Sequence, residues 1–259
     1  NRYKNDSDLK PYIWKTTDYG KTWTSITDGI PDGSFVRAVR EDPVRRGLLF
    51  AGTEEGIYVS FDDGSHWQSL QLNLPVASVR DLLIHGNDLV VATHGRAIWS
   101  LDDITPLRQL NQQVANSDVY LFNPEVTYRV RRGRRFARPR LSEGANPPDG
   151  AVIDYYLKDA PTSEVTLAIY DSQGKLVRRF TSQKPATPLT QPEEAFRGLP
   201  LPTKQGMNRY VWNLRYPAPE PLATGPHPAY GGAAVGALAL PGSYQVSLTV
   251  NGKTLTRPL

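Results

Sequence analysis

The stretch TTDYGKTW at residues 16–23 recurs, 44 residues further along the chain, as SFDDGSHW at residues 60–67. Both copies have the form Ser/Thr-x-Asp-x-Gly-x-x-Trp, and we call them the first box and the second box. A sequence repeat with a period in the forties is typical of the four-stranded blades of a β-propeller. The repeat therefore predicts an all-β fold for the first part of the chain.

The repeat extends beyond the boxes. An Ile-aromatic pair precedes each box, and a third pair at 98–99 begins an incomplete copy that lacks the Gly and the Trp. Val36-Arg37 also recurs as Val79-Arg80. Further strands are expected at 35–39, 48–52, 79–84 and 89–92. Residues 1–104 are therefore expected to hold the last two to three blades of a propeller: the outer strands of one, a complete blade at 34–72 and most of a third at 77–103.

The box residues suit a tight turn between two strands. The carboxylates of Asp18 and Asp62 can accept hydrogen bonds from backbone N–H groups just downstream, which stabilises such a turn. Gly20 and Gly64 permit a positive φ, which other residues resist. We therefore interpret both aspartates as structural rather than catalytic. The tryptophans that end the boxes, Trp23 and Trp67, are expected to bury their rings between neighbouring blades.

Fewer than three blades cannot close a propeller, which needs four to eight. An incomplete propeller would also leave a long unpaired strand edge. We therefore expect the chain to be the C-terminal part of a longer protein. The missing blades of the same polypeptide would precede Asn1, and they are the first expected partner.

Composition fits an all-β protein outside the cytoplasm. The chain has 22 Pro, 21 Gly and 13 Tyr, and turn signals recur at short intervals. It has no cysteine, which excludes disulfides and thiolate metal sites. No run of 18 apolar residues occurs, so no membrane span is expected. We expect an extracytoplasmic location: secreted, periplasmic or on the cell surface.

A second domain is expected after a linker. Residues 105–117 form this linker, with a short helix near 106–116. From residue 118 the chain returns to short alternating strands separated by turns, which favours an immunoglobulin-like β-sandwich over 118–259. The expected strands lie at 118–122, 150–157, 165–170, 175–180, 206–214 and 241–254, and a Pro-, Gly- and Ala-rich loop spans 217–240.

Two longer runs can be set beside the boxes: VVATHGRAIWSLDDITPL at 90–107 and NRYVWNLRY at 208–216. With them the chain resembles the large secreted bacterial Asp-box (BNR) repeat proteins of the sortilin-like or glycosyl-hydrolase-like group. In that group a propeller precedes an immunoglobulin-like domain of the flagellar-hook-capping type. The resemblance covers nearly the whole chain. Its motifs specify architecture more than activity, because relatives include receptors, sialidases and xyloglucan-cleaving enzymes.

A binding surface is expected on the rim of the propeller opposite the boxes. The turns at 53–56 and 93–97 and the loops at 28–34 and 72–77 are expected to open there. They bring Asp28, Asp32, Glu54, Glu55, His94 and Arg96 to this rim, with Arg37 and Arg80 near the axis. The alternative is ordinary loop polarity. A sialidase needs an arginine cluster and a Tyr nucleophile, which two blades cannot supply in full.

One segment makes the chain basic. Residues 129–140 hold seven arginines, and without them the net charge of +4 would be −3. We interpret this Arg-rich entry segment as a structural or protein contact rather than a nucleic-acid site, because no nucleic-acid-binding fold surrounds it. The candidate contact residues are Arg129, Arg131, Arg132, Arg134 and Arg135.

Function follows less directly than fold. The histidines lack metal-ligand spacing, so no metal or cofactor is expected. The favoured hypothesis is a non-catalytic binding or scaffold part of a large extracytoplasmic propeller protein. It would engage a protein or glycan partner. A further possibility is a subunit of a cell-surface assembly, in which this chain is the ordered part of something longer. The alternative is the C-terminal part of a glycoside hydrolase whose catalytic residues lie upstream of this chain.

Overall fold

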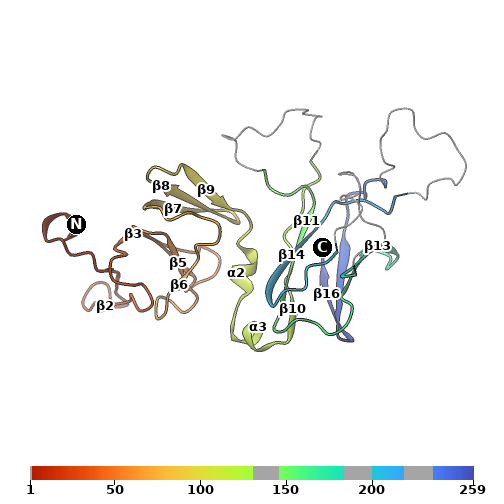
Figure 1. Cartoon of the computed structure of the whole chain (residues 1–259), viewed down its shortest axis with the longest axis horizontal. Helices are drawn as coiled ribbons and strands as arrows, with labels where there is room; N and C mark the ends of the chain where they lie inside the picture. The colour runs from red at the N-terminus through yellow and green to blue at the C-terminus, as the bar shows by residue number, and fades with distance from the viewer. Residues whose placement is uncertain (1, 131–145, 184–199, 219–235) are drawn as a thin grey trace, which may run out of the picture. The chain divides into compact units, whose positions relative to one another are not determined.

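The computed structural model describes residues 2–130, 146–183, 200–218 and 236–259. These residues form two compact units, Asn1–Asn111 and Gln112–Leu259, each with its own apolar core. Both units are built from antiparallel sheets, which confirms the all-β class (Figure 1). Within the described residues the sheets do not close into a barrel or a ring.

The first unit contains three successive sheets of two, four and three strands, in the orders β1-β2, β3-β4-β5-β6 and β7-β8-β9. A short helix, α1 (Arg2–Asn5), precedes them. The strands are β1 (Trp14–Lys15), β2 (Thr24–Ser25), β3 (Val36–Glu41), β4 (Leu49–Thr53), β5 (Ile57–Ser60), β6 (Gln68–Ser69), β7 (Val79–His85), β8 (Asp88–Thr93) and β9 (Ile98–Leu101).

The four-stranded and three-stranded sheets repeat one another in detail. The pairing of β3 with β4 shifts register between Val36 and Ala38, and the pairing of β7 with β8 shifts between Val79 and Asp81. The residue left over at each bulge is an arginine. A bulge turns the side chain of the extra residue away from the regular alternation of the strand. Both arginines of the repeat are therefore placed by the same backbone irregularity.

The two boxes are closed by the same hydrogen bonds. The Asp18 carboxylate accepts the Thr22 N–H at 2.9 Å, and the Asp62 carboxylate accepts the His66 N–H at 2.9 Å. The hydroxyl that begins each box accepts the N–H of the box glycine, at 2.8 Å in the first and 2.9 Å in the second. Both glycines have a positive φ, +87° and +89°. The side chains of Asp18 and Asp62 therefore stabilise the turns of the two boxes.

The tryptophans of the boxes differ, and the expectation that both are buried is wrong. Trp67 is 4% exposed, because the segment 26–29 of the preceding repeat covers it. Its backbone N–H donates to the Asp28 carbonyl at 2.8 Å and its indole N–H donates to the Ile26 carbonyl at 2.9 Å. Trp23 is 56% exposed, and its indole donates instead to the carbonyl of Gly20 in its own box. Burial of a box tryptophan thus depends on the repeat before it.

Successive sheets of the first unit pack through a close backbone approach. A Cβ atom added to Gly52, on β4, would lie 2.5 Å from the Cγ1 atom of Val79, on β7. Glycine is therefore required here by space. Val79, Leu82 and Phe50 belong to the larger core of this unit, and Trp67 and Ala51 belong to a smaller one.

Residues 105–117, the expected linker, form two short helices, α2 (Thr105–Gln109) and α3 (Gln112–Asn116). The compact units divide after Asn111, so α2 belongs to the first unit and α3 to the second. Helix α2 is held by Arg108, whose guanidinium donates to both carboxylate oxygens of the fully buried Asp42, at 2.8 and 3.0 Å. The first part of the linker is therefore bound to the strands that precede it.

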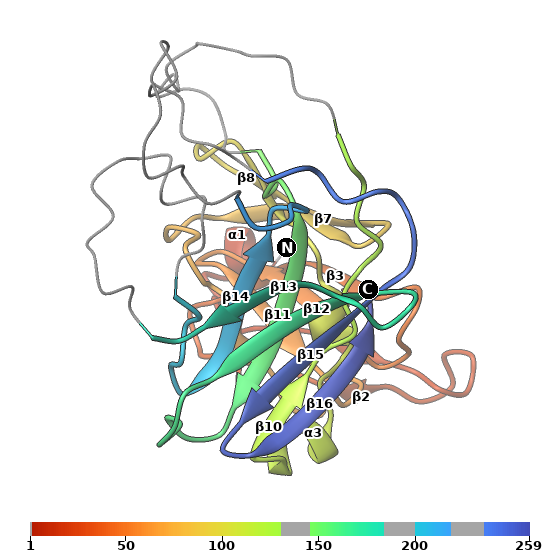
Figure 2. The ribbon, with the colours of Figure 1, turned by 90° about the vertical axis from the view of Figure 1, so that its right-hand side faces the viewer.

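The second unit is a sandwich of two sheets, in the orders β10-β11-β14 and β13-β12-β15-β16 (Figure 2). Alternate residues of both sheets point inward and share one core, which includes Tyr155, Trp212, Leu167 and Val246. The strands are β10 (Val119–Leu121), β11 (Ala151–Leu157), β12 (Thr166–Asp171), β13 (Leu176–Thr181), β14 (Gly206–Trp212), β15 (Tyr244–Val250) and β16 (Lys253–Pro258).

Most of the Arg-rich entry segment lies outside the described residues. Four of its candidate contact residues are in this part: Arg131, Arg132, Arg134 and Arg135. Arg129 is described, and its Nη1 atom donates to the Ala239 carbonyl at 3.1 Å. This contact lies within the second unit.

Candidate functional site

The candidate site lies where the bulged arginines meet the turn between β4 and β5. Arg37 Nε donates to Glu54 Oε2 at 2.7 Å, and Nη2 reaches the same oxygen. The hydroxyl of Ser78 donates to that oxygen at 2.7 Å. Arg80 contributes a positive charge near the same carboxylate. The structure therefore brings three of the expected rim residues, Arg37, Glu54 and Arg80, into one cluster.

Aromatic rings hold the Arg37 guanidinium in place. The rings of Tyr3 and Phe35 are stacked with their centroids 4.2 Å apart, and the guanidinium carbon of Arg37 lies 4.6 Å from the Phe35 centroid. The Arg37 side chain is 12% exposed. Stacking on aromatic faces and pairing with a carboxylate fix the plane of a guanidinium. Arg37 is therefore a positioned group that orients Glu54.

Glu54 is held in its ionised form. Burial raises the pKa of this carboxyl group, but the hydrogen bonds from Ser78 and Arg37 outweigh it, and the pKa lies below its usual value. A general acid in glycoside hydrolysis needs the opposite, a carboxyl group whose pKa is raised. Glu54 is therefore suited to accept hydrogen bonds from a ligand or a neighbour and unsuited to donate a proton.

The other expected rim residues lie close by but are less constrained. Glu55 is exposed, and its carboxylate accepts the Ser34 hydroxyl at 3.0 Å. The His94 N–H donates to the Ser78 carbonyl at 2.8 Å, which places His94 next to the Glu54 cluster. Arg96 is exposed, and its carbonyl accepts the Trp99 indole N–H at 2.7 Å. Both side chains of the 93–97 turn face solvent.

Asp28 does not lie with this cluster. Its carboxylate is 3.7 Å from the His66 ring, and its carbonyl accepts the Trp67 N–H. The loop at 28–34 therefore runs from the second box, at Asp28, to the cluster of Arg37, Glu54 and Arg80, which we call the rim cluster, near Ser34. The expectation that Asp28 shares the rim with Glu54 is wrong, because the loop crosses between the two ends of the strands. Asp32 is exposed.

Residues that the sequence did not single out complete the cluster: Ser34, Ser78, Tyr3 and Phe35. The Phe35-Val36-Arg37 order could have suggested an aromatic neighbour for the arginine. Nothing in the sequence indicates Ser78, because its role depends on the packing of one sheet against the next. Among the residues that the structure describes, no group of three or more His, Cys, Asp or Glu side chains is arranged to hold a metal ion. No helix in the same part of the chain is long and apolar enough to cross a membrane.

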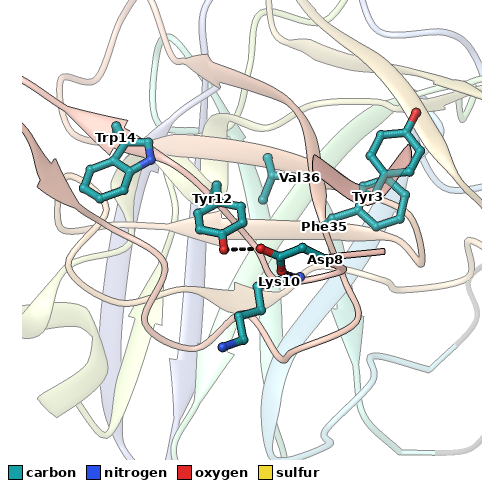
Figure 3. Close-up of a pocket in the computed structure, with 7 residues that line it drawn as sticks. All are labelled: Tyr3, Asp8, Lys10, Tyr12, Trp14, Phe35 and Val36. Atoms are coloured by element: carbon teal, nitrogen blue, oxygen red, sulfur yellow. Dashed lines mark hydrogen bonds between the residues drawn. The ribbon is translucent and has the colours of Figure 1, made fainter. Parts of the chain in front are cut away.

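A pocket of about 270 Å³ opens beside β1, next to this cluster. Figure 3 shows its side chains, with the stacked rings of Tyr3 and Phe35 on one side and Trp14 on the other. The Tyr12 hydroxyl donates to Asp8 at 2.6 Å, so these two polar groups engage each other. The pocket is lined by Tyr3, Asp8, Lys10, Tyr12, Trp14, Phe35 and Val36.

Comparison with known proteins gives no family. No protein-family model and no curated protein matches the chain. Among solved structures it is similar to the extracellular domain of the putative one-component system BT4673 from B. thetaiotaomicron, with 9% identity and a TM-score of 0.28. The match covers 95% of this chain and 27% of that structure, so this chain spans about a quarter of its length. At this level of similarity neither fold nor function is carried over.

Proposed function

We propose that residues 1–104 are the last blades of an Asp-box β-propeller and that the chain is a non-catalytic binding or scaffold part of a larger extracytoplasmic protein. The observation that carries the proposal is the exact repetition of backbone detail. Two sheets share the same bulge at an arginine, and two boxes share the same turn hydrogen bonds. Such repetition is what stacked propeller blades have in common. The second unit would then be the immunoglobulin-like domain that follows the propeller.

The rim cluster is the proposed binding surface. Arg80 is exposed and carries a positive charge beside the ion-paired Glu54. His94 and Arg96 add exposed polar groups on the neighbouring turn. A surface with a fixed carboxylate and exposed cations suits a partner that offers hydroxyl groups and a negative charge, such as an acidic glycan or an acidic protein loop.

Binding to a glycan microarray with acidic and neutral members tests the proposal. We expect retention of carboxylate-bearing glycans and at least a tenfold loss for Arg80→Ala, because a desolvated charge-assisted contact contributes about 1.5–3 kcal/mol. Arg40→Ala is the matched control, since Arg40 is also an exposed arginine of the first unit. If no glycan is retained, the glycan partner is excluded and a protein partner remains.

Catalysis by residues of this chain is tested with the same protein, whereas the rival function places its catalytic residues upstream of the chain. We expect no release of 4-methylumbelliferone from its sialic acid or xyloglucan-oligosaccharide conjugates. Turnover that is lost in Glu54→Gln and kept in Glu55→Gln would overturn the non-catalytic proposal, because it would make Glu54 a catalytic group.

A further inference from the structure

The bulged arginines of the two repeated sheets occupy the same backbone position but have different turn residues beside them. In the four-stranded sheet, the Glu54 N–H donates at 3.1 Å to the carbonyl of the residue two before Arg37. In the three-stranded sheet, the His94 N–H donates at 2.8 Å to the carbonyl of the residue two before Arg80. His94 therefore holds the place in the second of these sheets that Glu54 holds in the first. Each arginine and its turn residue belong to one sheet, so the comparison involves residues 35–98 alone.

The change at this place reverses the charge of the turn. The turn at 53–56 carries two glutamates, and the turn at 93–97 carries a histidine and an arginine. Arg37 pairs with Glu54, and its side chain is 12% exposed. Arg80 is exposed, and in the part of the chain that the structure describes no carboxylate forms a salt bridge with it. The three-stranded sheet therefore keeps the cation of the repeat and lacks its anion.

Glu54 adds a hydrogen-bond acceptor near the exposed guanidinium. The hydrogen bonds that the described residues donate to this carboxylate, from Arg37 and Ser78, all end on Oε2. Oε1 accepts none of them, and the Glu54 side chain is 35% exposed. Arg80 lies near enough to act electrostatically on the same carboxylate. A ligand bound to Arg80 therefore has an acceptor oxygen within its surroundings as well as a cation.

We propose that Arg80 binds the carboxylate of a uronic acid residue in a glycan, in the place that Glu54 occupies beside Arg37. An ionised carboxylate can only accept hydrogen bonds, so the ligand group that meets Glu54 Oε1 is a donor. A uronic acid carries a carboxylate and hydroxyl groups on one ring and meets both requirements. A carboxylate side chain of a protein partner has no donor on the same group. The inference rests on the proposed function and deepens it by choosing one of its acidic partners.

Two substitutions of equal size at His94 test the vacant place. His94→Glu supplies the missing carboxylate from the chain itself and should block the ligand, whereas His94→Gln supplies an uncharged side chain of the same shape. The probe is tri-galacturonic acid, titrated into the full chain by calorimetry, and its methyl ester is the matched uncharged ligand. We expect His94→Glu to bind the acid about tenfold more weakly than His94→Gln, and the ester to bind the unaltered chain about tenfold more weakly than the acid, because a charge-assisted hydrogen bond is lost. Arg40→Ala should bind as the unaltered chain does.

Four results would overturn the inference. They are equal binding by His94→Glu and His94→Gln, equal binding of the acid and the ester, no saturable binding of the acid at millimolar concentration, and tighter binding of a sulfated lactose than of the acid. A poly-glutamate peptide that binds in preference to tri-galacturonic acid would overturn it in favour of an acidic protein loop.

A readout without ligand tests the geometry. The carboxyl group introduced by His94→Glu should titrate at a lower pH when Arg80 is present than in the double variant with Arg80→Ala, because a nearby cation favours the ionised form. NMR of the chain with ¹³C-labelled glutamate measures this titration, and dispersed spectra show that the variants are folded. Equal titration in the two variants would show that Arg80 does not reach this place, and it would overturn the site.

The outcome is separable from that of the proposed function. Retention of sulfated glycans that is lost in Arg80→Ala, without binding of tri-galacturonic acid, overturns the uronate site and keeps the rim surface. Binding of tri-galacturonic acid followed by its cleavage overturns the non-catalytic proposal and keeps the uronate site. Failure of every acidic glycan and every acidic peptide to bind overturns both.

Discussion

Removal of the Arg108 guanidinium should destabilise the first unit more than removal of an exposed ion pair does. Asp42 has a fully buried side chain, and Arg108 is 9% exposed and donates to both of its oxygens. Breaking a buried pair on one side leaves an uncompensated charge and costs about 3–5 kcal/mol. The Val44 and Arg45 N–H groups still reach Asp42, at 3.3 and 3.2 Å, so we expect Arg108→Ala to cost about 3–4 kcal/mol.

Urea and thermal unfolding followed by tryptophan fluorescence measure this effect. Four of the five tryptophans, at positions 14, 23, 67 and 99, belong to the first unit. For a unit of this size about 3 kcal/mol corresponds to a fall in Tm of at least about 12 °C. Adding Asp42→Asn to Arg108→Ala should recover part of the loss, because the uncompensated charge is gone.

The matched control is Arg40→Ala. Arg40 pairs with Asp81 at 2.6 Å, but the two side chains are 45% and 62% exposed, so this pair contributes about 0.2–1 kcal/mol. If Arg108→Ala and Arg40→Ala lower the free energy of unfolding by the same amount, burial does not set the strength of these pairs. Helix α2 would then not be anchored through Asp42.

Two more predictions concern the contact between the repeats. Gly29→Ala should lower the free energy of unfolding by about 1–3 kcal/mol more than Gly33→Ala does. Both residues have a positive φ, but only at Gly29 would the new Cβ lie 2.2 Å from the Trp67 carbonyl oxygen. Equal losses of free energy in denaturant unfolding would show that the loop can move away. His66 has a raised pKa because it is hydrogen-bonded to Asp62 and lies near Asp28. The stability that His66 contributes is fully present below its unfolded pKa of 6.5 and is lost as pH rises through the higher folded pKa. His66→Thr should therefore make Tm less dependent on pH between these two pKa values. A pH profile of Tm that does not change in this variant would contradict the role of this histidine.

Local chemistry made much of the fold predictable. The two boxes, the turn at 171–174 and the Asn251-Gly252 turn are set by residues next to one another in the chain, and strands lie where alternation or apolar runs predict them. Each of these features depends on a few neighbouring side chains and their preferred backbone angles. Sequence reasoning therefore located nearly every strand to within a few residues.

Features that depend on a neighbouring repeat were not predictable in the same way. Trp23 and Trp67 occupy the same place in identical patterns, yet one is exposed and the other buried. The cluster at Glu54 needs Ser78 from the next sheet, and Asp28 joins the second box rather than the rim. Composition and spacing describe one repeat at a time, whereas these contacts join two. The arginine repeat at 37 and 80 was the exception, because its period was visible in the sequence.

The cover over Trp67 also makes the second repeat depend on the first. The Trp67 indole and backbone N–H groups donate to the carbonyls of Ile26 and Asp28, so both bonds require the segment 26–29 to stay in place. A change that displaces this segment would leave both donors without these acceptors and expose the indole ring to solvent. Damage to one repeat would thus be transmitted along the chain to the next.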